Sequence, residues 1–308
     1  MRFKMFAIAL LATSSLAQAE PTPKEKLLQP PPGAQHYTIS STAGKHGDLW
    51  AWKTEDGTIA HRMSMSLRGW ITETDQTTLL GADGRPVRIA VRGFTDSGDA
   101  TEDFSVDAGG IARWKTAVDE GSAPFGNKRY SAYGGPFLAG ALDVEALVAA
   151  GEPGIELLPG GRASIAIGKA AEIDGPKGKQ TVKLAYITGI GFAPSPVWLD
   201  ADNRYFGNAG VISVLPAGYE AVGPQLKEIQ DAAEATMVRD IARKMLSAEN
   251  RTPTLVDNVL LFDAVAGRYL PGRAVLIADG KVAAVGAAGS IKAPAGAVTI
   301  DGRGKTLL

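Results

Sequence analysis

The chain has 308 residues, of which 45% are hydrophobic and 21% are charged, and its formal net charge is −1. This composition is typical of a soluble globular protein, and the balanced charge argues against a polybasic surface for nucleic acid. Because the sequence contains no cysteine, it excludes a disulfide scaffold, thiolate metal ligands, a cysteine nucleophile and an acylated lipoprotein anchor. At this length, two domains are expected.

The first 19 residues have the layout of a secretory signal peptide. Arg2 and Lys4 supply positive charge, residues 5–11 form a short apolar run, and Ala17-Gln18-Ala19 is an A-x-A cleavage site. We therefore predict a periplasmic or secreted bacterial protein with no integral membrane segment after cleavage. The following residues, 20–35, are rich in proline and are expected to form an extended lead-in.

Residues 36–215 are predicted to be mainly antiparallel β-structure. Short β-rich runs alternate with Asp-Gly and Gly-Gly turns, a pattern that favours hairpins in a meander. The predicted strands cover 49–53, 58–71, 87–94, 104–116 (with a turn at 108–110), 162–173, 180–190, 197–200 and 205–215. One helix is expected over 138–150, because Leu142, Leu147 and Val148 fall near one helical face and Gly151 follows. The expected fold class is α+β, a curved sheet packed on one helix.

Residues 216–253 are predicted to be a helix and a linker. Pro224 suits a first helical turn, and the apolar residues that follow it step by three or four, so they form a single packing stripe: Leu226, Ile229, Ala233, Met237, Ile241 and Met245. Asp240 and Lys244 are spaced as an ion pair on this helix. The polar residues 247–254 are expected to form a domain boundary.

Residues 254–308 contain four predicted strands, at 255–262, 274–278, 281–285 and 297–300. Asp279-Gly280 separates the second and third as a two-residue hairpin. Asp301-Gly302-Arg303-Gly304-Lys305 follows the last strand. This ordered set resembles the opening of a metal-dependent amidohydrolase of the imidazolonepropionase-like or dihydroorotase-like kind, over about a sixth of the chain.

The resemblance implies a small β-sandwich that flanks a TIM-type barrel. In the family, Pro-Gly and then Asp-x-His-x-His follow these strands, and one or two divalent ions, expected to be zinc, activate a water molecule. The chain ends at Leu308, before that point, and a complete barrel needs on the order of 200 further residues. The expected architecture is therefore a partial β-sandwich with no complete TIM barrel. Without partner strands, Val275, Ile277, Val282 and Val285 should be partly exposed.

No catalytic, cofactor-binding or metal-binding residue is assigned within the chain. His36, His46 and His61 lack the spacing of a metal site. Two acidic stretches, 99–103 and 200–203, lack the glycine-centred calcium loop and are interpreted as solvated turns. Gly175-Pro176-Lys177-Gly178-Lys179 lacks the first glycine of a phosphate loop and is interpreted as a hairpin tip.

Two functions remain open. The first is the N-terminal portion of a secreted amidohydrolase that hydrolyses non-peptide C–N bonds of a small-molecule substrate, whose catalytic barrel is absent from this chain. The chain alone is then expected to be inactive. The second is a non-catalytic periplasmic protein that binds or carries a lipid or another apolar ligand, because the β-rich segment resembles half-barrel carriers that wrap a sheet around a helix.

Overall fold

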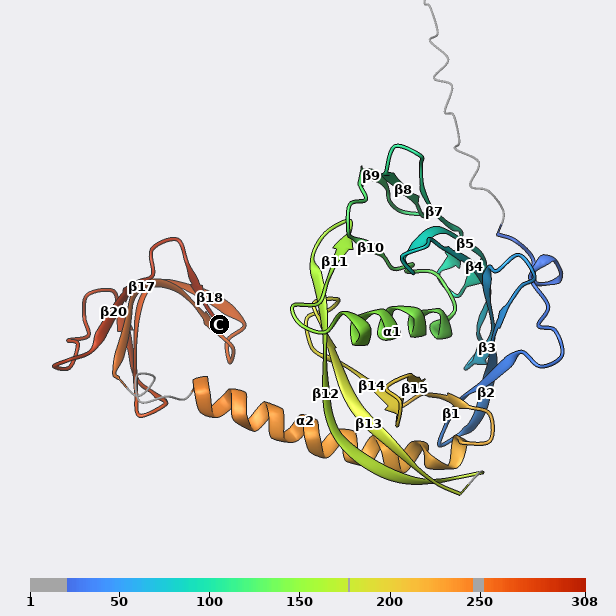
Figure 1. Ribbon diagram of the computed structural model, residues 1–308. Coiled ribbons are helices and arrows are strands. Elements are labelled where there is room, and N and C mark those ends of the chain that lie inside the picture. Colours follow the sequence, from blue (N-terminus) through green and yellow to red (C-terminus); the bar gives the residue numbers. More distant parts are fainter. Residues whose placement is uncertain (1–20, 177, 246–251) are drawn as a thin grey trace, which may run out of the picture. The chain divides into compact units, whose positions relative to one another are not determined.

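The computed structural model describes residues 21–176, 178–245 and 252–308, and the chain divides into two compact units, Met1–Gln230 and Asp231–Leu308 (Figure 1). The predicted signal peptide and most of the predicted boundary at 247–254 lie outside the described residues. The predicted fold class is confirmed, because both units are built mainly from antiparallel strands and neither contains a TIM barrel.

The larger sheet of the first unit has ten strands in the order β16-β1-β2-β3-β4-β5-β7-β8-β9, with β6 paired to β5. Its strands are β1 (Gln35–Ser41), β2 (Gly44–Lys53), β3 (Ile59–Leu67), β4 (Trp70–Leu80), β5 (Pro86–Thr95), β6 (Gly98–Asp99), β7 (Glu102–Val106), β8 (Ile111–Lys115), β9 (Glu120–Pro124) and β16 (Ser213–Pro216). All its pairings are antiparallel, as expected for a meander of hairpins.

The second sheet has six strands in the order β10-β11-β12-β13-β14-β15. They are β10 (Arg129–Tyr130), β11 (Ile155–Leu158), β12 (Arg162–Gly175), β13 (Gly178–Thr188), β14 (Ser195–Asp200) and β15 (Tyr205–Gly207). Gly175 pairs with Gly178, so the glycine-rich segment is the tip of a long hairpin, as predicted. A single bridge between Asn208 and Val214 connects the end of this sheet to β16 of the larger one. The single predicted sheet is therefore divided in two.

The prediction of a single strand over residues 58–71 is wrong, because this range contains a turn between two strands. Arg68 and Gly69 have φ angles of 52° and 88° and join β3 to β4, with Leu67 opposite Trp70. A two-residue hairpin with both φ angles positive is usually marked by Asn-Gly or Asp-Gly, and arginine gives no such signal. The predicted strand 205–215 likewise divides into β15 and β16, which belong to different sheets.

Helix α1 (Ala141–Ala150) lies between the two sheets of this unit, preceded by the 3₁₀ turn η2 (Phe137–Gly140) (Figure 1). It ends where Gly151, with a φ of 60°, donates its N–H to the Leu147 carbonyl. Val144 and Leu147 enter a core that takes residues from both sheets: Tyr37, Ile39, Leu49 and Met63 from one, and Ala163, Ala185, Ile187, Val197, Leu199 and Tyr205 from the other. Burial of this face positions the helix.

The predicted lead-in is not extended throughout. Residues Lys24–Lys26 form the 3₁₀ turn η1, and Leu27 directly after it is buried. Helix α2 (Gly223–Met245), preceded by the 3₁₀ turn η3 (Glu220–Val222), matches the predicted helix. Its apolar stripe is buried at Leu226 but exposed at Ile241 and Met245, so the predicted packing holds for the first turns only.

The second unit contains a five-stranded sheet in the order β19-β18-β17-β20, with β21 also paired to β17. The strands are β17 (Thr254–Asp263), β18 (Arg268–Ala278), β19 (Lys281–Ala287), β20 (Val298–Asp301) and β21 (Thr306–Leu307). The predicted Asp279-Gly280 hairpin is confirmed, and both residues have positive φ. Val282 and Val285 are 63% and 53% exposed, as expected, whereas Val275 is buried, contrary to expectation.

His61 is buried on the face of β3 that points into the first unit, opposite Gln76 on β4. Its Nδ1 atom has no hydrogen-bond partner among the described residues. Burial lowers the pKa of His61 to about 4, because the imidazolium ion loses its hydration.

We expect this histidine to make stability depend on pH. Its folded pKa lies below the usual value of 6.5, so the unfolded state binds the proton first as the pH falls. Between pH 7 and pH 5 the protein should lose about 2 kcal/mol of unfolding free energy through this group. Urea unfolding at both pH values measures this loss in the wild type and in His61→Gln. The unfolding free energy of the variant should fall by about 2 kcal/mol less than that of the wild type. An equal loss in both would contradict the assignment.

Candidate functional site

A cavity of about 240 Å³ lies between α1 and the second sheet. Its walls are mostly apolar: Val144 and Leu147 from α1, Ile155 and Leu157 from β11, Ala163 from β12, Ile187 from β13 and Val197 from β14. The helix and the curved sheet contact each other elsewhere in the core, so the space between them is bounded by well-packed side chains. We call this space the apolar cavity.

An ion pair forms one polar part of its lining. Arg129 Nε donates to Asp143 Oδ1 at 2.6 Å and Arg129 Nη2 donates to the Leu142 carbonyl at 3.1 Å, while Ser131 Oγ donates to Asp143 Oδ2. The Arg129 side chain is only 4% exposed. These contacts connect β10 to the first turn of α1, and each carboxylate oxygen of Asp143 accepts one hydrogen bond.

The same ion pair lines a second, smaller cavity. This cavity has a volume of about 170 Å³ and is more polar, with Gln76 and Thr78 from β4 in its wall. Arg129, Ser131, Phe137 and Asp143 line both cavities. The Arg129 side chain therefore lies in the shared wall of two partly open cavities.

Two further polar residues of the apolar cavity, Tyr205 and Asn208, form hydrogen bonds within the protein. Tyr205 donates its hydroxyl proton to Asn208 Oδ1, and Asn208 Nδ2 donates to the Pro196 carbonyl at 3.0 Å. Burial raises the pKa of Tyr205, so the phenol keeps its proton and remains a donor. Asn208 Nδ2 keeps a second N–H, and Ser195 also lines this side of the cavity.

Exposed apolar side chains mark where the cavity opens to solvent. Phe137 and Ile190 both line it and are 52% and 57% exposed. Phe192, two residues further along the same loop, is fully exposed. Exposed large apolar residues at the edge of an apolar cavity favour the entry of an apolar molecule.

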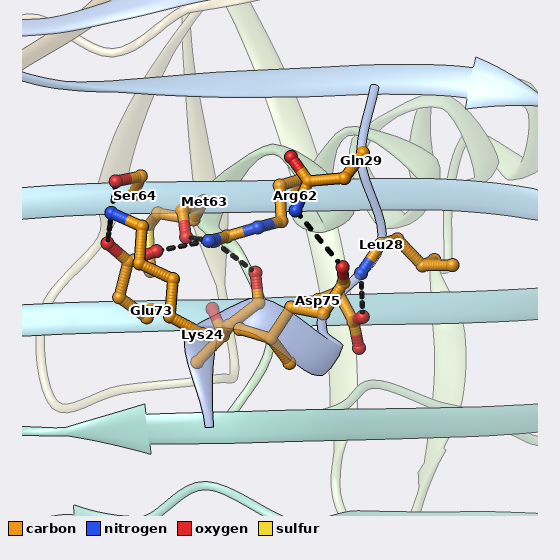
Figure 2. Close-up of polar contacts among 10 residues, drawn as sticks. Lys24, Leu28, Gln29, Arg62, Met63, Ser64, Glu73 and Asp75 are labelled. Carbon is orange, nitrogen blue, oxygen red and sulfur yellow. Dashed lines mark hydrogen bonds and ion pairs between the residues drawn. The ribbon is translucent and has the colours of Figure 1, made fainter. Parts of the chain in front are cut away.

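A second cluster of buried charges lies on the outer face of β3, β4 and β5, under the N-terminal segment (Figure 2). Glu73 accepts hydrogen bonds from Arg62 and from Lys24 Nζ, the latter at 2.6 Å. Burial alone would raise the pKa of Glu73, but the hydrogen bonds from Lys24, Arg62 and Ser64 outweigh it and lower the pKa. Because each of its oxygens is occupied, this cluster is structural.

Asp75 completes that cluster. It pairs with Arg92 from β5. It also accepts the Leu28 backbone N–H at 2.7 Å (Figure 2). The hydrogen bond from Leu28 and the burial of Leu27 hold the segment between η1 and β1 against the sheet. The segment predicted to be an extended lead-in is thus part of the folded unit.

The three histidines are not in contact with one another, and each has a different environment. His36 Nε2 lies 2.6 Å from Asp48 Oδ1, His46 Nε2 lies 2.7 Å from Ser41 Oγ, and His61 is buried. Over residues 21–176, 178–245 and 252–308, no three His, Asp or Glu side chains are grouped as metal ligands.

The interpretation of residues 99–103 as a solvated turn is wrong for Glu102. This side chain is buried and accepts hydrogen bonds from Tyr130 Oη and from the backbone N–H groups of Tyr133 and Gly134. It therefore fixes the loop that leads into η2. Asp200, in contrast, accepts the N–H groups of Asp202 and Arg204 in the turn between β14 and β15, as predicted.

Sequence reasoning did not find Arg129 and Asp143. Arg129 belongs to a two-residue strand in a polar stretch, and Asp143 reads as an ordinary acidic residue in a first helical turn. Their 14-residue separation gives no motif, because only the packing of α1 against the sheet brings them together.

Comparison with protein-family models, with curated proteins and with solved structures finds no match to this chain. Among the helices that the structure describes, none has the length and hydrophobicity needed to cross a bilayer.

The buried charge cluster should be costly to break. Glu73→Gln leaves the Arg62 guanidinium buried without its counter-charge, so we expect the unfolding free energy to fall by about 3 kcal/mol or more. Urea unfolding monitored by tryptophan fluorescence measures the change. The matched control is Glu156→Gln, which removes a surface partner of Arg162 and should cost under about 1 kcal/mol. An equal loss of unfolding free energy in the two variants would contradict a buried ion pair between Glu73 and Arg62.

Proposed function

We propose that the chain is the N-terminal part of a secreted metal-dependent amidohydrolase that hydrolyses non-peptide C–N bonds. Residues 254–308 would be the opening strands of its β-sandwich. The proposal rests on the ordered sequence pattern over these residues, from Asn258 to the Asp301-Gly302-Arg303-Gly304-Lys305 segment. The metal ligands of the family, Asp-x-His-x-His, do not occur in this sequence, so this chain alone should be inactive.

One structural observation supports the sandwich. Apolar residues of β19 and β20 are largely exposed in the second unit: Val282, Val285, Val298 and Ile300. A sheet that is one half of a sandwich carries such a face, because the opposing layer buries it. Val259 and Val275 on the central strands β17 and β18 are buried, although Val275 lies opposite Val285, so the exposed apolar residues belong to the outer strands β19 and β20.

The coding DNA tests this proposal directly. Read beyond the codon for Leu308 in all three frames, it should encode Pro-Gly and, after a short gap, Asp-x-His-x-His. A longer chain expressed from that DNA should hydrolyse amides or cyclic imides in a metal-dependent way, whereas residues 20–308 should not. Turnover by residues 20–308 with zinc alone would contradict the proposal.

A second candidate function concerns the first unit: binding of a small apolar molecule in the apolar cavity. A cavity of about 150 Å³ with apolar walls takes up benzene, so the present cavity would hold roughly eight to ten carbon atoms. The exposed Phe137 and Ile190 at its edge support entry from solvent. This candidate is compatible with the first, because it assigns a role to a different unit.

We expect 1-aminonaphthalene to bind in the apolar cavity and to gain fluorescence as it leaves water. Val144→Phe fills the space from α1 and should weaken binding by about tenfold or more. Ala149→Phe places the same side chain on an exposed position of the same helix and should leave binding unchanged. Equal affinities for the two variants would exclude the cavity as the site.

A further inference from the structure

The apolar cavity contains a charged donor group, the Arg129 guanidinium, whose hydrogen-bonding capacity is only partly used. Arginine has five N–H donors. Arg129 uses Nε toward Asp143 and Nη2 toward the Leu142 carbonyl, and no contact in the described part of the chain engages Nη1. Since the side chain is 4% exposed, water reaches it only through the cavities that it lines. A charged donor that faces a cavity and has no protein partner favours a ligand that supplies an acceptor.

The charge of that acceptor is limited by Asp143. The carboxylate neutralises Arg129, and both groups line the same cavity, so the site as a whole carries no net charge. An anionic head group on Arg129 would face the Asp143 carboxylate in a medium that screens charge poorly. A cationic head group would face the guanidinium. An uncharged oxygen acceptor avoids both repulsions.

Most of the other polar groups in the lining donate to protein acceptors. Tyr205 and Asn208 donate to Asn208 Oδ1 and to the Pro196 carbonyl, and Ser131 donates to Asp143. Asn208 Nδ2 keeps a second N–H and Ser195 also lines the cavity, but Arg129 is the charged donor among these groups, and it lines both cavities. The apolar walls on the α1 side suit an alkyl or ring portion.

We propose that the ligand of the apolar cavity is an uncharged carbonyl compound with a small hydrocarbon portion, such as a ketone, ester or amide. Its carbonyl oxygen accepts a hydrogen bond from Arg129, and its hydrocarbon portion lies among Val144, Leu147 and Ile187. This inference rests on the second candidate function above and adds the chemistry of the head group.

The test is a displacement series against bound 1-aminonaphthalene with three compounds matched in size: 2-heptanone, hexanoate at pH 8 and n-octane. We expect 2-heptanone to bind about tenfold more tightly than n-octane, and also more tightly than hexanoate. Tighter binding of hexanoate would identify an anion site and overturn the proposal. Equal binding of 2-heptanone and n-octane would overturn it too, while leaving the cavity as an apolar site. Failure of the reporter itself to bind would overturn both.

Arg129→Lys identifies the donor. Lysine keeps the positive charge opposite Asp143 but lacks the fork of N–H groups, so the preference for 2-heptanone over n-octane should disappear while n-octane binding persists. The matched control is Arg162→Lys, at an arginine paired with Glu156 on the surface, and it should keep the preference. Retention of the preference in Arg129→Lys would exclude Arg129 as the donor. If this variant does not fold, the wild-type series still decides the head group.

Discussion

The burial of one face of α1 between two sheets is the constraint on which the first unit depends. Val144 and Leu147 contact residues from both sheets, so neither sheet completes its core without the helix. Helix α1 has ten residues and leaves a space between itself and the second sheet. The apolar cavity is what remains, and the ion pair of Arg129 and Asp143 fixes the helix at that point.

The unit also buries many polar groups, and their partners explain its topology. The outer face of β3–β5 carries Arg62, Glu73 and Asp75, which the residues around η1 cover and partly neutralise (Figure 2). Glu102 is also a buried carboxylate, and its oxygens accept hydrogen bonds from Tyr130 and from the backbone of the loop before η2. Both arrangements replace water by hydrogen bonds, which is the condition for burying a charge. They fix chain segments, whereas Arg129 keeps N–H donors without protein partners toward a cavity.

The two units carry different arguments about function. The second unit supports the amidohydrolase proposal through its sequence pattern and the exposed valines of β19 and β20. The first unit supports ligand binding through an enclosed space with a defined polar group. A protein that combines both would present a binding domain ahead of a hydrolase domain, and each proposal stands or falls on its own measurement.

The sequence by itself determined the fold class, the hairpins at Gly175–Gly178 and Asp279-Gly280, and the helices near 141–150 and 223–245, because these depend on local turn chemistry and periodicity. It did not reveal the Arg68-Gly69 turn, since arginine seldom takes positive φ, and it placed Glu102 in solvent. Only the tertiary structure decided the division into two sheets and the meeting of Arg129 with Asp143. Both result from long-range packing around α1, and no spacing of residues along the chain encodes which side chains such packing brings together.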